Sequence, residues 1–120
     1  MKAVLLISHG SHSAKTKKEI EVLTADLKKK ISVPIMSFAF LEIEKPSIPN
    51  GISNCVKKGA TEIILLLNFL NSGRHVGVDI PNILEEARKK YPSVRFQMTA
   101  PVGQHPAIAD LFLDLIKAHA

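Results

Sequence analysis

The sequence predicts an α/β fold, a four-stranded parallel sheet with helices on both faces. Three observations support this prediction: four apolar runs have the length of strands, stretches with helical spacing follow each of them, and the runs are continuously apolar, as in strands buried on both sides. Right-handed crossovers between such strands place helices above and below the sheet. Because the 120 residues contain no repeat or linker, we expect one domain over residues 1–120.

Turn and capping residues divide the chain into its elements. Strands are expected at residues 3–8, 35–40, 61–67 and 94–98. A capping box from Thr16 to Glu19 is expected to open the first helix, and Gly59 to stop the second, which covers about 48–58. The third helix is expected to start by Asp79 and Pro81 and to end at Tyr91-Pro92, and the last to begin at His105-Pro106. The last helix carries a wide apolar stripe, formed by Ile108, Leu111, Phe112, Leu115 and Ile116.

We expect the strand order 2-1-3-4, which is flavodoxin-like. This order places the first and third strands side by side, and ligands of open α/β sheets bind at the carboxyl ends of strands where the order reverses. His9 directly follows the first strand, and His75 follows the third across a short loop. The two imidazoles are therefore predicted to converge on one bound group, and imidazole is both the commonest metal ligand and a proton acceptor near neutral pH.

Composition excludes some classes of protein. With 46% hydrophobic and 22% charged residues the chain is typical of globular proteins, and its longest apolar stretch is far shorter than the roughly 20 residues of a membrane span. The single cysteine, Cys55, cannot form an internal disulfide, and no secretory signal is recognised, so we expect a cytoplasmic protein. A net charge of +5 favours acidic partners. Because the lysines cluster at helix ends, we expect them to form a solvated helix surface rather than a track for nucleic acid, and a small polycarboxylate ligand fits the charge equally well.

Glu42 follows the second strand and is the candidate third group of the site. Two histidines are too few ligands for a closed structural zinc site, whereas an open coordination shell leaves positions for a substrate. Glu42 is either a ligand or a surface acid in a loop, and the sequence leaves both interpretations open. His105 is expected to cap the last helix, beside Pro106.

The same segments resemble the short-form sirohydrochlorin cobaltochelatases, whose archaeal members are also linked to nickel insertion. The resemblance runs in register over essentially the whole chain. It rests on Ile7-Ser8-His9-Gly10-Ser11, on Ala39-Phe40-Leu41-Glu42 with Lys45-Pro46-Ser47, on Phe69-Leu70-Asn71-Ser72-Gly73-Arg74-His75-Val76 with Asp79-Ile80-Pro81, and on Pro101-Val102-Gly103-Gln104-His105-Pro106.

The resemblance implies a lyase that inserts Co²⁺ or Ni²⁺ into sirohydrochlorin, a cyclic tetrapyrrole with eight carboxylates, and releases two protons. It implies no permanent cofactor, with the metal as a substrate, and a place in the biosynthesis of cobalamin or of coenzyme F430, the latter in methanogenesis. His9 and His75 are assigned to the metal, and His9, Glu42 and His75 to catalysis. Phe69 is placed against the ring face, and the residues assigned to substrate binding are Gly10, Ser11, Lys45, Leu70, Asn71, Ser72, Gly73, Arg74 and His75.

Long-form members of the family resemble two such domains in one chain, so a homodimer is expected to rebuild the cleft between them. Other functions stay open at this stage. A ferrochelatase acting on sirohydrochlorin for sirohaem would use the same residues, and a metal, tetrapyrrole or flavin-binding module would use the same sheet edge without catalysis. A histidine phosphatase fits poorly, because its arginine before the histidine is replaced here by Ser8.

Overall fold

The strands form one parallel sheet of order β2-β1-β3-β4, which confirms the predicted order. The computed structural model describes residues 1–119. Its strands are β1 (Lys2–Ser8), β2 (Ile35–Phe40), β3 (Glu62–Leu67) and β4 (Arg95–Met98). At the carboxyl end of β1, Ser8 pairs with Phe40 of β2 and Ile7 pairs with Leu67 of β3. Three strands therefore end side by side at one edge of the sheet.

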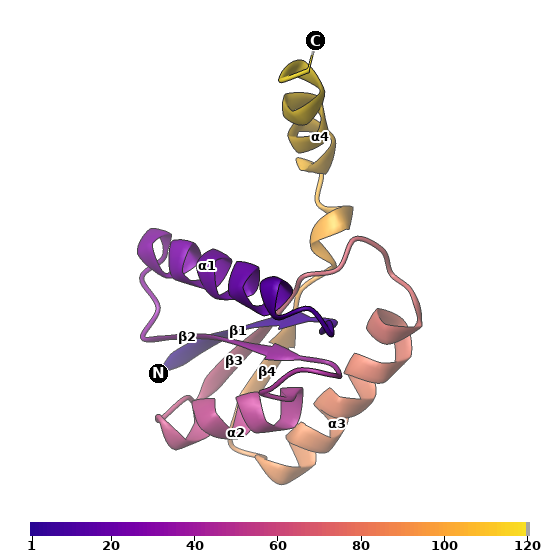
Figure 1. The fold of residues 1–120 in the computed structure, drawn as a ribbon. Coiled ribbons are helices and arrows are strands. Elements are labelled where there is room, and N and C mark those ends of the chain that lie inside the picture. The colour runs from indigo at the N-terminus through magenta and orange to yellow at the C-terminus, as the bar shows by residue number, and fades with distance from the viewer. Residues whose placement is uncertain (120) are drawn as a thin grey trace.

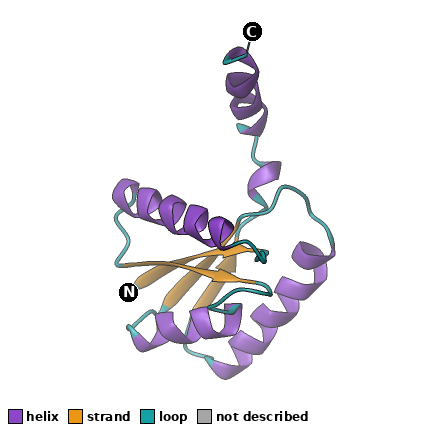
Figure 2. Ribbon diagram, in the orientation of Figure 1, coloured by secondary structure: helices purple, strands orange, loops and turns teal. Residues whose placement is uncertain are grey.

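Three helices cover the two faces of this sheet (Figure 1, Figure 2). On one face lies α1 (Ala14–Lys30), whose Ile20 belongs to a buried cluster with Val4 and Leu6 of β1. On the other face lie α2 (Ile48–Lys57) and α3 (Ile80–Lys90), which bury the larger cluster of the core. The prediction of helices on both faces is confirmed for these three.

The last helix, α4 (Ile108–Lys117), differs from the prediction because it projects away from the sheet (Figure 1). None of its residues is buried, and the molecule is 52 Å long against 31 and 29 Å in its other dimensions. A 3₁₀ turn, η2 (Val102–Gln104), precedes it. The expected start at His105-Pro106 is too early, because these residues form the turn before the helix. The expectation that His105 caps the helix is also wrong, because the N-cap residue of α4 is Ala107 and no side chain caps it. Instead, His105 Nδ1 accepts a hydrogen bond from the Ala107 N–H at 3.0 Å within the preceding turn.

One other prediction of a helix start is wrong, the capping box at Thr16, whereas α3 begins at Ile80 with Asp79 as its N-cap residue and Pro81 in its first turn, as expected. The capping box at Thr16 is not formed, because Ser13 takes the N-cap position and α1 begins at Ala14. The loop after β3 ends at Arg74, and His75 opens a π-helical turn, η1 (His75–Asp79), that runs directly into α3. Helix α2 also begins at Ile48 as expected.

No helix within residues 1–119 has both the length and the apolar character needed to cross a membrane.

Candidate metal centre

His9, Glu42 and His75 come together at the edge where β1, β2 and β3 end. Each offers one ligand atom, and these atoms all lie within 4.8 Å of one another. The rings of the two histidines have centroids 4.9 Å apart and planes tilted by 52°. The structure therefore shows the convergence of the two imidazoles, and it places the Glu42 carboxylate with them rather than in a separate loop.

Backbone pairing beyond the strands brings Glu42 to His9. The Leu41 N–H donates to the Ser8 carbonyl at 2.8 Å and the Glu42 N–H to the His9 carbonyl at 3.0 Å, which extends the β1–β2 ladder to the metal centre. The next residue, Gly10, has φ +101°, and a Cβ atom there would lie 1.9 Å from the Glu42 carbonyl oxygen. Only glycine permits this approach, because other residues have a side chain that would collide and rarely adopt this φ. The result is a 2.7 Å contact between His9 Nε2 and Glu42 Oε1.

Both histidines are held through Nδ1. His9 Nδ1 lies 3.1 Å from the Gly10 carbonyl oxygen, and His75 Nδ1 lies 2.8 Å from Asp79 Oδ2. Because a carbonyl and a carboxylate only accept hydrogen bonds, both contacts are hydrogen bonds when each ring carries a proton on Nδ1. Each Nε2 is then the nitrogen available to a metal ion, and outer partners of this kind orient metal-binding histidines in proteins.

The centre is open to solvent. The side chains of His9, Glu42 and His75 are 44%, 52% and 45% exposed. Two imidazoles and one carboxylate fit first-row transition metals, which accept mixed nitrogen and oxygen ligands. Three protein ligands leave coordination positions free for a substrate, as in catalytic rather than structural metal sites.

The loop that leads to His75 is fixed at both ends. At its start, the Asn68 N–H donates to the Ile7 carbonyl at 2.8 Å, and the Asn68 side chain donates to Ser8 Oγ at 3.1 Å. Its middle packs on η2, where a Cβ atom at Gly103 would lie 2.0 Å from the Leu70 carbonyl oxygen. The Gln104 side chain also donates to that oxygen at 3.0 Å. The turn before α4 therefore supports the loop that carries His75.

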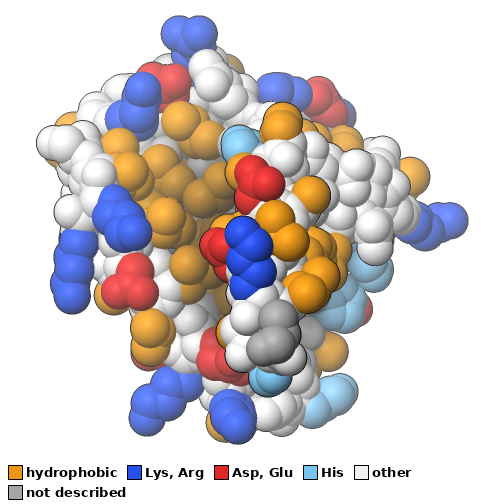
Figure 3. Space-filling model, turned by 90° about the horizontal axis from the view of Figure 1, so that it is seen from above, with side chains coloured by type: hydrophobic (Ala, Val, Ile, Leu, Met, Phe, Trp, Pro, Cys, Tyr) orange, Lys and Arg blue, Asp and Glu red, His pale blue; other side chains and the backbone are white. Residues whose placement is uncertain are grey.

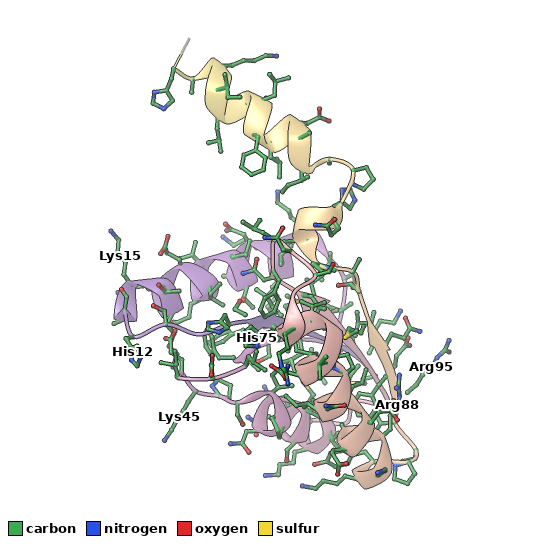
Figure 4. All side chains as sticks on the ribbon, turned by 90° about the vertical axis from the view of Figure 1, so that its right-hand side faces the viewer. His12, Lys15, Lys45, His75, Arg88 and Arg95 are labelled. Carbon is green, nitrogen blue, oxygen red and sulfur yellow. The ribbon has the colours of Figure 1, made fainter. Side chains whose placement is uncertain are left out.

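The predicted substrate residues divide between two hollows. Leu70, Asn71, Gly73 and His75 line one of about 380 Å³, with Asn68, Phe69 and Val76. Ser72 and Arg74 belong to the same loop but are not among its lining residues. Lys45 lines another hollow with Lys17 and Lys57, and Figure 4 shows it pointing outward, away from His75. Gly10 and Ser11 lie beside the metal centre, where the Ser11 N–H donates to Glu44 Oε1 at 2.8 Å.

Three supporting residues, Asp79, Glu44 and Asn68, were not predicted from the sequence. For Asp79 a signal existed, since it lies four residues after His75 and such residues are neighbours on a helical turn. No comparable spacing connects Ser11 with Glu44 or Ser8 with Asn68, because those contacts depend on the sheet.

Residues 3–119 match the model of the CbiX family. The chain belongs to the CbiX family. It is 37% identical over 101 residues to the sirohydrochlorin ferrochelatase of Bacillus subtilis (strain 168), a match covering 84% of this chain and 39% of that protein. It is 33% identical over 105 residues to the sirohydrochlorin cobaltochelatase of Priestia megaterium, covering 88% of this chain and 34% of that protein. The resemblance identified from the sequence is thereby confirmed.

The fold is also shared with a solved member. The crystal structure of the sirohydrochlorin chelatase SirB from Bacillus subtilis subspecies spizizenii, in complex with cobalt, matches with a TM-score of 0.90 at 31% identity. That match covers 98% of this chain but 50% of the SirB chain. The chain thus spans about half the length of SirB and less than half of the two relatives named above.

Proposed function

We propose that this chain inserts a divalent metal ion, Co²⁺ or Ni²⁺, into sirohydrochlorin. The observation that carries the proposal is the meeting of His9, Glu42 and His75, whose ligand atoms lie within 4.8 Å of one another. Membership of the CbiX family and the names of the relatives support the same substrate. The metal is a substrate in this reaction, held at the centre until the ring takes it up.

Exposure of the centre suits delivery of the metal. All three side chains are 44–52% exposed, so both the ion and a flat macrocycle reach them from solvent. The coordination positions that the protein leaves free are available to the ring nitrogens. Transfer then proceeds by exchange of the ligands on the metal, with nitrogens of the ring replacing His9, Glu42 and His75.

The pair formed by His9 and Glu42 also provides a place for a proton. Sirohydrochlorin loses two pyrrole protons when it takes up a divalent ion, so two protons leave the ring for each ion that enters. With the ion bound, His9 Nε2 and Glu42 Oε1 both serve as ligands. When the ion moves to the ring, their 2.7 Å separation lets one proton bridge them, and the second passes to solvent.

The loop after β3 is assigned to the substrate. Phe69 and Leu70 lie against the face of the ring, and Leu70 is 59% exposed in the free chain. The backbone N–H groups of residues 71–73 and the Arg74 guanidinium bind its carboxylates. Gly10 and Ser11 contact the ring from the β1 side, and Lys45 binds a carboxylate that reaches the neighbouring hollow.

We further propose that two copies form a homodimer that encloses the ring. The hollow beside His75 is about 380 Å³, and its lining includes His75 but neither His9 nor Glu42. SirB contains a second half beyond the part that matches this chain, and a two-fold dimer would supply the equivalent of that half. The expected cytoplasmic location and the assignment to cobalamin or coenzyme F430 synthesis stay predictions.

A competition assay tests the reaction and the metal. Purified protein is mixed with sirohydrochlorin and with Co²⁺, Ni²⁺ or Fe²⁺, singly and together, and the conversion of the pigment is followed by absorbance. We expect Co²⁺ or Ni²⁺ to be inserted faster than in the absence of protein. Preferred insertion of Fe²⁺ would instead favour a ferrochelatase, the activity named for the Bacillus subtilis relative. No acceleration with any metal, together with tight metal binding, would favour a metal carrier.

A further inference from the structure

A polar hollow of about 570 Å³ lies between α1, α2 and the loop that joins β2 to α2, and three lysines line it. Lys17 belongs to α1, Lys45 to the loop, and Lys57 to the last turn of α2. We call it the basic hollow, and its other lining residues are Pro46, Asn50, Ser53 and Asn54. Because α1 and α2 contact β2 from opposite faces of the sheet (Figure 1), the lysines are brought together by the tertiary structure rather than by one run of sequence.

The positive charge of the basic hollow is not neutralised by the protein. None of its lining residues is acidic, and none of the ion pairs within residues 1–119 includes one of its three lysines. The hollow along α1 that Lys18 lines is different, because Glu19 and Asp26 line it as well. Ammonium groups that share one hollow repel one another, and a bound anion removes that repulsion.

Neutral hydrogen-bond donors accompany the lysines. Asn50 and Asn54 lie four residues apart on α2, and both line the basic hollow. Among the described residues, the hydrogen bond that includes Asn50 uses its backbone N–H, which leaves the side-chain amide to solvent or to a ligand. Each of these amides offers two N–H donors and each lysine offers three. A charged oxygen group that enters the hollow therefore meets donors of both kinds, and hydrogen bonds between charged groups are the stronger ones.

A compact anion with several charges fits this set of residues. A group with a single charge would neutralise only part of the charge of three lysines. A nucleic acid needs a longer basic track, and on the face seen in Figure 3 the Lys and Arg side chains are spread out, several of them beside Asp or Glu. The volume of the basic hollow lies within the range of small-molecule sites, which is about 300–1,000 Å³.

We propose that the basic hollow binds a compact oxyanion with three or more negative charges, such as a tricarboxylate or a triphosphate. The site goes beyond the proposed function, because none of its residues is assigned to the metal or to the face of the ring. Two sources supply this chemistry. One is a free anion, and the other is a group of neighbouring carboxylates at the rim of sirohydrochlorin, one of which is already assigned to Lys45. In the second case the site rests on the proposed function.

Calorimetry with sodium tripolyphosphate tests the site on the protein without added metal. Lys17→Gln and Lys57→Gln each remove one charge from the basic hollow. Their matched controls are Lys18→Gln and Lys58→Gln, which change the next lysine in the chain, one that does not line this hollow. All four variants lower the net charge equally, so a difference between them comes from position. We expect each variant of the hollow to weaken binding about fivefold, as loss of an exposed ion pair does at most, and each control to stay within about twofold of wild type.

The place of binding is tested on the wild-type chain by NMR. Tripolyphosphate should shift the signals of the side-chain amides of Asn50 and Asn54, which line the basic hollow. The amide of Asn82, an exposed residue of α3 outside this hollow, is the control and should not shift. Because this measurement uses the unaltered chain, it does not depend on the folding of a variant.

Sirohydrochlorin distinguishes the two sources of the anion. If carboxylates of the ring occupy the hollow, sirohydrochlorin displaces tripolyphosphate and shifts the amides of Asn50 and Asn54. If the occupant is a free anion, the two ligands bind together. Both results support the site and identify its occupant.

Four results would overturn the proposal. They are no binding of tripolyphosphate, an equal loss of affinity in the hollow variants and their controls, an equal shift at Asn82, and tighter binding of a short single-stranded DNA than of tripolyphosphate. The last result would make this surface a nucleic-acid site. None of these measurements depends on metal insertion, so failure of the chelatase reaction would be seen separately.

Discussion

The two histidine-bearing segments of the metal centre reach the same geometry in different ways. His9 meets a carboxylate from another strand end, and its position depends on the β1–β2 register and on the close approach at Gly10. His75 meets Asp79 four residues later in its own helical turn. One arm of the centre therefore depends on the tertiary structure of the sheet, and the other depends on a local turn.

The carboxylates also contact different nitrogens. Glu42 faces Nε2 of His9, the nitrogen that a metal ion would bind, so it lies where a third ligand must lie. Asp79 faces Nδ1 of His75, on the far side of the ring from the ion, so it orients the imidazole without contacting the metal. Under the proposed function, this difference makes Glu42 a ligand of the metal and Asp79 a positioning residue.

Removal of a ligand is expected to have the largest effect. His9→Ala removes Nε2 and the proton site shared with Glu42. Loss of a residue that only orients a metal ligand lowers metal affinity or activity by roughly 10- to 100-fold. Because His9 is itself a proposed ligand, we expect Co²⁺ affinity and the rate of insertion to fall by more than that. The fold should persist, because the side chain is 44% exposed. Calorimetry with Co²⁺ and the sirohydrochlorin assay measure the two effects. Wild-type turnover by this variant would contradict the role of His9.

Removal of the Asp79 carboxylate, which orients His75, should lower Co²⁺ affinity less than the loss of His9 does. Asp79→Asn keeps the size of the side chain but removes its charge, and we expect Co²⁺ affinity to fall roughly 10-fold. Glu86→Gln serves as the control, since Glu86 lies on the same helix, α3, and pairs with Lys89. Equal Co²⁺ affinity in Asp79→Asn and Glu86→Gln would show that His75 does not need its partner.

The predictable part of this molecule is the part that follows from the apolar runs. Continuous apolar strands and the helical spacing between them predict the sheet, its order, and the meeting of His9 and His75 at one edge. The π-helical turn at His75 was not predictable, because Val76, Gly77 and Val78 are poor helix formers and the turn forms where tertiary contacts favour it. Asp79 was missed as a partner because its spacing of four residues from His75 brings the two side chains together only where this helical turn forms.

The last helix shows another limit of sequence interpretation. Its apolar stripe correctly predicts a last helix, although the helix begins at Ile108 rather than at His105-Pro106. The stripe does not say which surface it contacts. Hydrogen bonds in the turn at His105, together with the packing of Gly103, decide that α4 leaves its own sheet, and no periodic pattern encodes those contacts.

A change at Gly10 should perturb only the contact between His9 and Glu42, which depends on the sheet. Gly10→Ala adds a Cβ 1.9 Å from the Glu42 carbonyl at a φ of +101°, which we expect to destabilise the fold by about 1–3 kcal/mol. It should also weaken Co²⁺ binding, because His9 and Glu42 are pushed apart. Gly73→Ala is the matched control, since a Cβ there meets nothing within 4 Å. Urea unfolding measures the stability, and equal midpoints for the two variants would refute the role of the close approach.

The smallest effect is expected from Arg74, the residue just before His75. Its guanidinium is assigned to a carboxylate of the substrate, whereas the metal is assigned to His9, Glu42 and His75. Arg74→Ala should therefore raise KM and leave kcat and Co²⁺ affinity unchanged. Exposed ion pairs contribute little, so we expect KM to rise up to about fivefold. Initial rates against sirohydrochlorin concentration measure this. A lower kcat with an unchanged KM would instead show that Arg74 helps to orient His75. The position of His75 would then depend on more than its contact with Asp79 in the same helical turn.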